Sequence, residues 1–124
     1  MIMAIEVALL GGVGAALRYL ADLGISSRLG RSLPWGTMLV NITGSGLAGV
    51  VVGATTYQTV SPTSATLLLV GFLGGFTTAS TIAFEVVRLF EQRRPASAVG
   101  VCVGTLATAV AAGVAGLAIG AAAV

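Results

Sequence analysis

The sequence predicts an all-α membrane protein with four transmembrane helices. Of the 124 residues, 56% are hydrophobic and only 8% are charged, and the mean hydropathy is +1.05. A soluble domain carries about a quarter of its residues as charges, so the usual charged shell is missing here. Residues 32–84 and 95–124 contain no charge, and each stretch is longer than the ~20 apolar residues of one membrane crossing.

The spans are predicted to be helices rather than barrel strands. Within lipid, backbone groups are satisfied only in helices or closed barrels. Barrel strands alternate apolar and polar residues, whereas residues 67–70 and 121–123 are unbroken apolar runs. The first charge of the chain is Glu6, so no basic segment precedes the first apolar run, and a cleaved signal peptide is not expected.

The expected helices cover residues 2–23, 34–56, 63–90 and 96–122. The polar segment 26–32 forms the first turn, and Pro34 suits the start of the second helix. The third helix is rich in glycine, threonine and serine over residues 71–81, which predicts a distortion at its centre. No linker is long enough to separate a second domain, so residues 1–124 form a single transmembrane domain.

The arginines are distributed unevenly between the two sides of the membrane. The termini and the second loop share one side, which carries no arginine or lysine. The first and third loops share the other side, and the arginines in or near them are Arg28, Arg31, Arg88, Arg93 and Arg94. Since basic loops stay in the cytoplasm, we expect a plasma-membrane protein of fixed orientation with both termini outside the cytoplasm.

Glycine pairs four residues apart recur along the chain. Such small residues let helix backbones approach closely in lipid. The spacing is consistent with packing inside one subunit and equally with an oligomer interface. The pairs are Gly49/Gly53, Gly71/Gly75, Gly100/Gly104 and Gly116/Gly120.

Three polar positions at membrane depth have both a structural and a functional interpretation. Asn41 either joins two helices by hydrogen bonds or turns an amide donor toward a polar pathway. Arg18 either pairs with Asp22 one turn later or attracts anions at a pore entrance. Glu6 either reaches water near a helix end or couples transport to protons. Cys102 lies within the fourth span, and a single cysteine excludes an intramolecular disulfide and a cysteine metal site.

The centre of the third span carries the strongest functional signal. Adjacent glycines are followed there by the hydroxyl residues Thr77, Thr78, Ser80 and Thr81. A helix broken at mid-membrane frees carbonyl and N–H groups that bind ions. The alternative is a hydroxyl-lined kink that serves only packing.

Three motifs, in order and spacing, resemble the Fluc (CrcB) family of fluoride channels. They are Gly11-Gly12-x-Gly14-Ala15 with Arg18-Tyr19, Gly36-Thr37-x-x-Val40-Asn41-x-x-Gly44-Ser45, and Gly71-Phe72-x-Gly74-Gly75-x-Thr77-Thr78-x-Ser80-Thr81. They cover the first three helices, and the chain length also agrees.

The resemblance implies a passive, fluoride-selective channel, not an enzyme, that exports fluoride and confers fluoride resistance. It implies an antiparallel dimer with two pores and a structural sodium ion at its centre, held by the backbone carbonyls of Gly74 and Thr77. Arg18 matches a first-helix arginine expected in the vestibule. The positions implied along the anion path are Asn41, Ala79, Ser80, Thr81, Ile82 and Thr108.

Ala79 and Ile82 depart from the family pattern, which has phenylalanine at both positions. Neither residue offers the polar ring edge that an aromatic side chain presents to an anion. Together with the uneven arginines, this favours one half of an antiparallel heterodimer over a dual-topology homodimer. The resemblance then implies a second Fluc-type subunit with the opposite arginine and lysine bias.

Two alternatives remain open from the residues alone. One is a small proton-coupled multidrug-type exporter, in which Glu6 would be essential for transport. The other is a non-conducting structural subunit of a heterodimeric fluoride channel, because both phenylalanines are missing.

Overall fold

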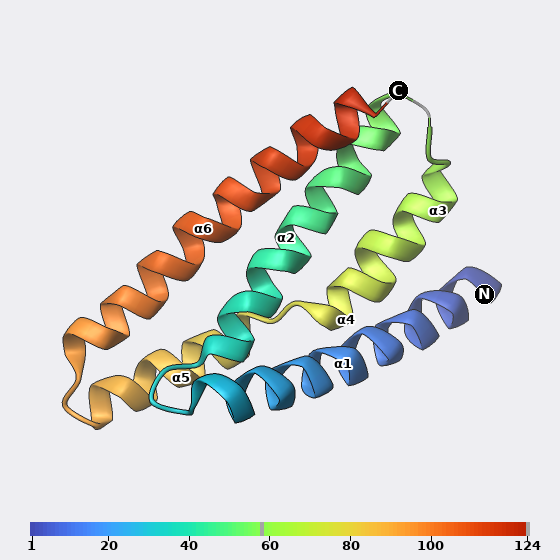
Figure 1. Cartoon of the computed structure of the whole chain (residues 1–124). Coiled ribbons are helices and arrows are strands. Elements are labelled where there is room, and N and C mark those ends of the chain that lie inside the picture. The colour runs from blue at the N-terminus through green and yellow to red at the C-terminus, as the bar shows by residue number, and fades with distance from the viewer. Residues whose placement is uncertain (58, 124) are drawn as a thin grey trace.

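The computed structural model describes residues 1–57 and 59–123, and all of the regular elements in this part of the chain are helices (Figure 1). The first, second and fourth spans are α1 (Ile2–Leu29), α2 (Trp35–Thr56) and α6 (Pro95–Ala122). The third span consists of α3 (Pro62–Thr66), the π-helical η1 (Leu67–Leu73), α4 (Gly74–Phe76) and α5 (Ala79–Glu91). All four are long and apolar enough to cross a membrane. The predicted class and the broken third span are confirmed, and the chain is a multi-pass membrane protein. The connection between the second and third spans includes Gln58, which lies outside the described residues.

The first helix extends further than the sequence suggested. It was expected to end at residue 23, with a turn over 26–32, yet α1 continues to Leu29. The polar side chains of this segment do not end the helix, because they can form hydrogen bonds within it. The Ser27 hydroxyl, for example, donates to the Gly24 carbonyl at 2.7 Å. At the standard rise, its 28 residues extend about 42 Å, beyond the ~30 Å hydrocarbon core. Gly30 then ends the helix with φ 82°, a conformation that favours glycine.

The helix backbones of α2 and α6 lie side by side and run in the same direction (Figure 1). A Cβ atom added at Gly49 would overlap the Gly113 carbonyl oxygen, and one added at Gly116 would overlap that of Gly46. One turn further along each helix, a Cβ atom added at Gly53 or at Gly120 would likewise overlap the backbone of the opposite helix. These two glycine pairs therefore pack α2 against α6 within the subunit, as one of the two interpretations predicted.

A second glycine contact joins α1 to the third span. A Cβ at Gly14 would overlap the Phe72 carbonyl oxygen, and one at Gly75 would overlap that of Gly11. Gly100 and Gly104, by contrast, have nothing within 4 Å of an added Cβ. Close packing inside the subunit thus explains three of the four predicted glycine pairs.

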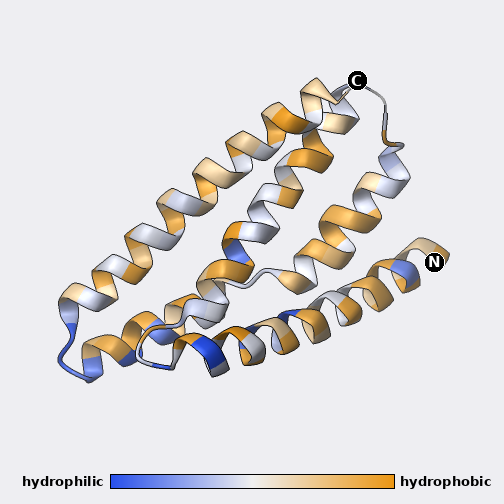
Figure 2. Ribbon diagram, viewed as in Figure 1, coloured by the Kyte–Doolittle hydropathy of each residue, from blue (hydrophilic) through white to orange (hydrophobic). Residues whose placement is uncertain are grey.

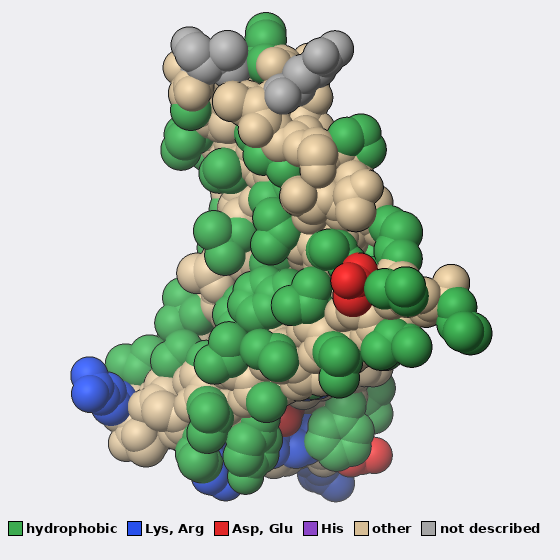
Figure 3. All heavy atoms as spheres, turned by 90° about the vertical axis from the view of Figure 1, so that its right-hand side faces the viewer, with side chains coloured by type: hydrophobic (Ala, Val, Ile, Leu, Met, Phe, Trp, Pro, Cys, Tyr) green, Lys and Arg blue, Asp and Glu red, His purple; other side chains and the backbone are tan. Residues whose placement is uncertain are grey.

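The charged loops meet at one end of the molecule, away from both termini (Figures 1 and 2). Arg94 Nη1 donates to the Ser32 carbonyl at 2.7 Å and joins the third loop to the first. In the space-filling view the arginine side chains gather at this same end (Figure 3). A small buried core of Leu89, Ala98 and Val101 packs α5 against α6 there. We call this end, with Arg28, Arg31, Arg88, Arg93 and Arg94, the arginine end.

Substituting a packed glycine tests the α2–α6 contact. Gly116→Ala is expected to destabilise the subunit by about 1–3 kcal/mol, because the added methyl group forces the α2 and α6 backbones apart. The measurement is the thermal unfolding midpoint in detergent micelles. Gly104→Ala is the matched control on the same helix, since its methyl group meets open space. Equal midpoints for the two variants would contradict the packing.

Candidate functional site

The third span is interrupted near its centre by two residues with an extended backbone. Thr77 has φ −86° and ψ 159°, and Thr78 has φ −153° and ψ 124°. Adjacent glycines weaken the helix just before this point, and the β-branched threonines favour the extended conformation. Thr78 then starts α5 as its N-cap, because its hydroxyl accepts a hydrogen bond from the Thr81 N–H at 3.2 Å.

The side chain of Asn41 replaces the helix hydrogen bonds that the interruption removes. Its Nδ2 donates to the Thr78 carbonyl at 2.7 Å, and its Oδ1 accepts from the Thr78 N–H at 2.8 Å. One amide therefore satisfies both backbone groups of the extended residue, from a different helix. This confirms the structural interpretation of Asn41. The amide nitrogen of Asn41 carries two hydrogens, so one Nδ2 hydrogen is not used by the contact with Thr78.

Arg18 supports the other side of the interruption. Its Nε donates to the Gly75 carbonyl at 3.2 Å, an acceptor that an uninterrupted helix would pair with the Ala79 N–H. The expected alternative, an ion pair with Asp22, is not formed: among the described residues the ion pair within 4.0 Å is Arg88–Glu85. A cation at this depth is stabilised by a carbonyl dipole instead of a carboxylate.

Two carbonyl groups at the interruption keep free acceptor capacity. In the described part of the chain, Gly74 O and Thr77 O accept no hydrogen bond from a side chain or from backbone outside the helices. Thr81 N–H, the donor that a continuous helix would offer Thr77, bonds the Thr78 hydroxyl instead. Gly74 is also exposed on the surface of the subunit. Carbonyl oxygens are suitable ligands for a hard cation, so these two groups fit the predicted sodium site.

An open pocket of about 390 Å³ lies between the interruption and α6, and we call it the central groove. Asn41 and the hydroxyl residues form its polar wall, while Ala79 and Ile82 contribute apolar surface where larger side chains would narrow it. The residues that line the central groove are Asn41, Ser45, Thr77, Thr78, Ala79, Ile82, Cys102, Thr105, Leu106 and Ala109.

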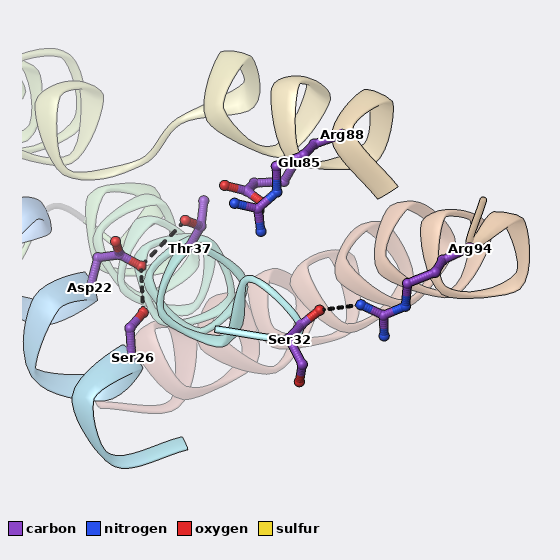
Figure 4. Close-up of polar contacts among 7 residues, drawn as sticks. All are labelled: Asp22, Ser26, Ser32, Thr37, Glu85, Arg88 and Arg94. Atoms are coloured by element: carbon purple, nitrogen blue, oxygen red, sulfur yellow. Dashed lines mark hydrogen bonds and ion pairs between the residues drawn. The ribbon is translucent and has the colours of Figure 1, made fainter. Parts of the chain in front are cut away.

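A second, more enclosed pocket of about 300 Å³ lies at the arginine end, and we call it the charged pocket. Asp22 Oδ1 accepts weak hydrogen bonds from Ser26 and Thr37, both at 3.5 Å (Figure 4). Gly36 makes room for this carboxylate, because a Cβ there would overlap it. Glu85 and Arg88 form an ion pair at 2.8 Å whose geometry is not that of a hydrogen bond. The remaining lining residues are Tyr19, Leu23, Arg31, Leu33, Pro34 and Thr81.

A pair of hydroxyl groups connects the two pockets. Thr78 lines the central groove and Thr81 lines the charged pocket, and their Oγ1 atoms are 3.0 Å apart. The Ser80 hydroxyl lies 3.2 Å from the same Thr78 oxygen but lines neither pocket. The interruption therefore places polar atoms in sequence from the arginine end to mid-membrane.

The structure brings most of the predicted site residues together but separates two of them. Thr108 is exposed outside the groove, and its hydroxyl donates to the Gly104 carbonyl at 2.6 Å. Glu6 is exposed near the start of α1 and lines neither pocket. The fourth-helix threonine that lines the groove is Thr105, which the sequence did not single out and whose hydroxyl oxygen is buried. Its one available signal is spacing, since Ala98, Val101 and Thr105 follow the helical period of a buried face.

Replacing Asn41 tests its role at the interruption. Asn41→Ala is expected to lower the unfolding free energy by about 1–3 kcal/mol for each Thr78 backbone group left unpaired. Thermal unfolding in detergent measures the loss, and hydrogen exchange reports the Thr78 amide directly. The control is Thr43→Ala, because the Thr43 hydroxyl only adds a bond to carbonyls of its own helix. Unchanged protection of the Thr78 amide in Asn41→Ala would refute this role.

The chain matches known proteins over most of its length. The family model of CrcB-like protein, Camphor Resistance (CrcB), matches residues 5–117. A "Fluoride-specific ion channel FluC" of Nitrobacter winogradskyi is 37% identical over 86% of this chain and 86% of its own. "FluC 1" of Leifsonia xyli subsp. xyli is 39% identical over 91% of this chain and 81% of its own. "FluC 2" of Mycobacterium bovis is 44% identical over 76% of this chain and 71% of its own. With a broken third span that carries the expected glycine and threonine motif, the chain belongs to the CrcB family.

Proposed function

We propose that this protein is a subunit of a passive, fluoride-selective channel that exports fluoride from the cytoplasm. The observation that carries the proposal is the interrupted third span, whose hydroxyl groups, together with the Asn41 amide from α2, connect the charged pocket to the central groove. The relatives named as fluoride-specific ion channels support the same function. Because their names describe channels, they also favour this function over a proton-coupled exporter.

The chemistry of fluoride explains why a passive path is enough. Hydrogen fluoride is a weak acid that crosses lipid in its neutral form and dissociates in a more alkaline cytoplasm. The anion is then trapped, and a channel lets it leave down its own gradient without ATP. No phosphate-binding loop of the Walker type is needed, and the sequence contains none.

The path we propose uses neutral donors rather than fixed charges at mid-membrane. The lining of the central groove contains no charged residue, whereas the charged pocket is lined by Arg31 and Arg88 together with Asp22 and Glu85. The arginine end as a whole is net positive, because its five arginines exceed its three carboxylates, and a net positive entrance raises the local anion concentration. Inside, the unused Asn41 N–H and the Thr78 hydroxyl replace part of a hydration shell without holding the anion too tightly, whereas the Thr77 hydroxyl donates to the Leu73 carbonyl. Arg18 contributes by supporting the Gly75 carbonyl, so its vestibule role is indirect.

We further propose an antiparallel dimer with a structural sodium ion between its subunits. The support is the exposed position of Gly74 and the free acceptor capacity of the Gly74 and Thr77 carbonyls. Two such carbonyls from each subunit would hold the ion. The ion would neutralise the carbonyl dipoles that the two interruptions present to each other, so its role is to join the subunits.

The partner is proposed to be a second Fluc-type chain with the opposite basic bias. Five arginines lie at the arginine end, and the opposite side of the membrane carries no arginine or lysine. This chain therefore inserts in one orientation, with its termini outside the cytoplasm. An antiparallel neighbour must insert the other way. Numbered names such as "FluC 1" and "FluC 2" among the relatives are consistent with paired subunits. Ala79 and Ile82 leave the central groove wide, so aromatic side chains are expected from the partner.

A second candidate is a structural subunit that does not line a conducting path by itself. The observation that favours it is again the apolar, ring-free surface of Ala79 and Ile82 in the groove. It differs from the first candidate only in where the open pore lies within the dimer.

Fluoride efflux from liposomes tests the function. Liposomes that contain this chain together with an oppositely biased Fluc-type subunit are expected to release fluoride and to retain chloride, as followed with ion-selective electrodes. This chain alone is expected to remain near the background of protein-free liposomes. Robust efflux from the lone chain would reject the heterodimer requirement. Absence of efflux from every combination would reject the channel.

Removing sodium tests the proposed ion without relying on conduction. The dimer is purified in sodium chloride or in the chloride of a bulky organic cation at equal ionic strength, so that screening is unchanged. Size-exclusion chromatography in detergent is expected to show a dimer in sodium and a monomer in the organic cation, because a large cation cannot enter a site made by four carbonyls. A dimer that persists equally in both salts would contradict the sodium site.

A further inference from the structure

Ser45 is a polar residue of the central groove to which no role has been given above. It lies on α2 four residues after Asn41, so both side chains are on the same face of the helix, about 6 Å apart along its axis. Because α2 begins at the arginine end, Ser45 lies farther from that end than Asn41 does (Figure 1). It therefore extends the polar wall of the groove away from the charged pocket.

The Ser45 hydroxyl is accessible and has no hydrogen-bond partner within the described residues. The residue is half-buried and its Oγ atom is not covered, whereas the Oγ1 atom of Thr105 is buried. A hydroxyl in a helix commonly donates to a carbonyl of the preceding turn. Thr43, two positions earlier on α2, donates in this way to the Leu39 carbonyl at 2.8 Å. In the described part of the chain Ser45 makes no such bond, so its hydrogen is free for a ligand in the groove.

The other hydroxyl groups of the groove already form hydrogen bonds or are covered. Thr77 donates to the Leu73 carbonyl at 2.9 Å, and the Thr78 oxygen lies within 3.2 Å of two neighbouring hydroxyls of its own span. The Thr105 oxygen is out of reach of the groove because it is buried. Among the described residues, Ser45 is thus the groove-lining residue whose hydroxyl is both accessible and unpaired.

The groove ends against α6 at the level of Ser45. A Cβ atom added at Gly113 would lie 3.6 Å from the Ser45 carbonyl oxygen. One turn further along α2, a Cβ atom added at Gly49 would overlap the Gly113 carbonyl oxygen, so the two helix backbones are in contact there. Ala109, one turn before Gly113, is the last residue of α6 that lines the groove. An anion that moves past Asn41 therefore reaches a closed end at which Ser45 supplies the free donor.

The geometry points to Ser45 as a second contact for the anion: its hydroxyl donates to fluoride at the closed end of the groove, after fluoride has left the Asn41 amide. This inference rests on the proposed channel function and adds a residue to it. The α6 surface toward this end of the groove is apolar, with Leu106 and Ala109. Without the Ser45 hydroxyl, fluoride would lose water there and gain no donor in return.

Two neutral donors on one helix face suit the movement of a strongly hydrated anion. Each donor replaces a hydrogen bond that fluoride gives up when it leaves water. Several weak positions in series let an ion enter and leave, whereas a single strong position would hold it. Asn41 and Ser45 provide two such positions, one helical turn apart.

Ser45→Ala tests this contact, because it removes the hydroxyl and keeps the Cβ atom. The conducting assembly is reconstituted in liposomes, and fluoride efflux is compared between the variant and the unaltered chain. Efflux through the central groove is expected to fall about tenfold, the effect of losing one hydrogen bond to an ion. Ala109→Trp, which fills the groove with an indole ring, defines the share of the total efflux that the groove carries.

Two further measurements separate an anion contact from a structural role. The thermal unfolding midpoint of Ser45→Ala in detergent is expected to equal that of the unaltered chain, because the hydroxyl has no partner within the described residues and alanine suits a helix. Thr43→Ala is the matched control on the same helix, since the Thr43 hydroxyl bonds only carbonyls of α2. Its fluoride efflux should not change.

Each outcome decides the inference. Unchanged efflux through the groove in Ser45→Ala would overturn it and leave the channel function intact. A loss of efflux with a lower unfolding midpoint, or the same loss in Thr43→Ala, would overturn it in favour of a structural effect. If Ala109→Trp removes no efflux, the open path lies elsewhere in the dimer and Ser45 is not a contact. If the unaltered assembly does not conduct, the proposed function itself fails, and the inference fails with it.

Discussion

The organisation of this protein depends on how the backbone is satisfied where the third span is interrupted. Thr77 and Thr78 are extended in a region where lipid offers no hydrogen bonds. Unpaired, the freed groups would cost about 1–3 kcal/mol each and would favour a continuous helix. Asn41, Arg18 and the Thr78 hydroxyl supply partners from α2, α1 and the span itself. The interruption is therefore a built element of the fold, supported from three sides.

The glycine contacts hold the supporting residues in place. Asn41 on α2 reaches Thr78 only if α2 keeps its depth and rotation, and the backbone contact with α6 fixes both. Arg18 on α1 reaches the Gly75 carbonyl because Gly14 and Gly75 let α1 and the third span approach closely. Two close-packed helix pairs thus position the polar groups, and the space between them becomes the central groove. Packing and site are consequences of the same small residues.

The sequence predicted the spans and the distortion because each depends on local composition. The glycine spacing predicted close helix contacts but left open whether they lie within one subunit or between subunits. Hydropathy located the four helices, and the threonine-rich stretch after Gly74-Gly75 located the interruption. The partner of Arg18 was not predictable in this way, since Asp22 is close in sequence whereas Gly75 is close only after folding. The end of α1 was misplaced because polar residues end a span without ending a helix.

The groove-lining residue of α6 shows the same difference between local and tertiary information. Thr105 and Thr108 are equally polar and lie one turn apart, but the first is buried beside the central groove and the second is exposed outside it. The side of a uniformly apolar helix that faces its neighbours is set by contacts along its whole length. Composition does not encode which side of the helix that is.

The parallel contact between α2 and α6 has a consequence for biogenesis. The second span leaves the ribosome well before the fourth, so its glycine surface has no permanent neighbour while the third is being made. Until α6 is inserted, Gly46, Gly49 and Gly53 face lipid or the insertion machinery. Folding of the subunit is therefore completed late, and a ribosome that stalls within α6 would leave a chain whose second helix, and with it Asn41, is not yet fixed in depth.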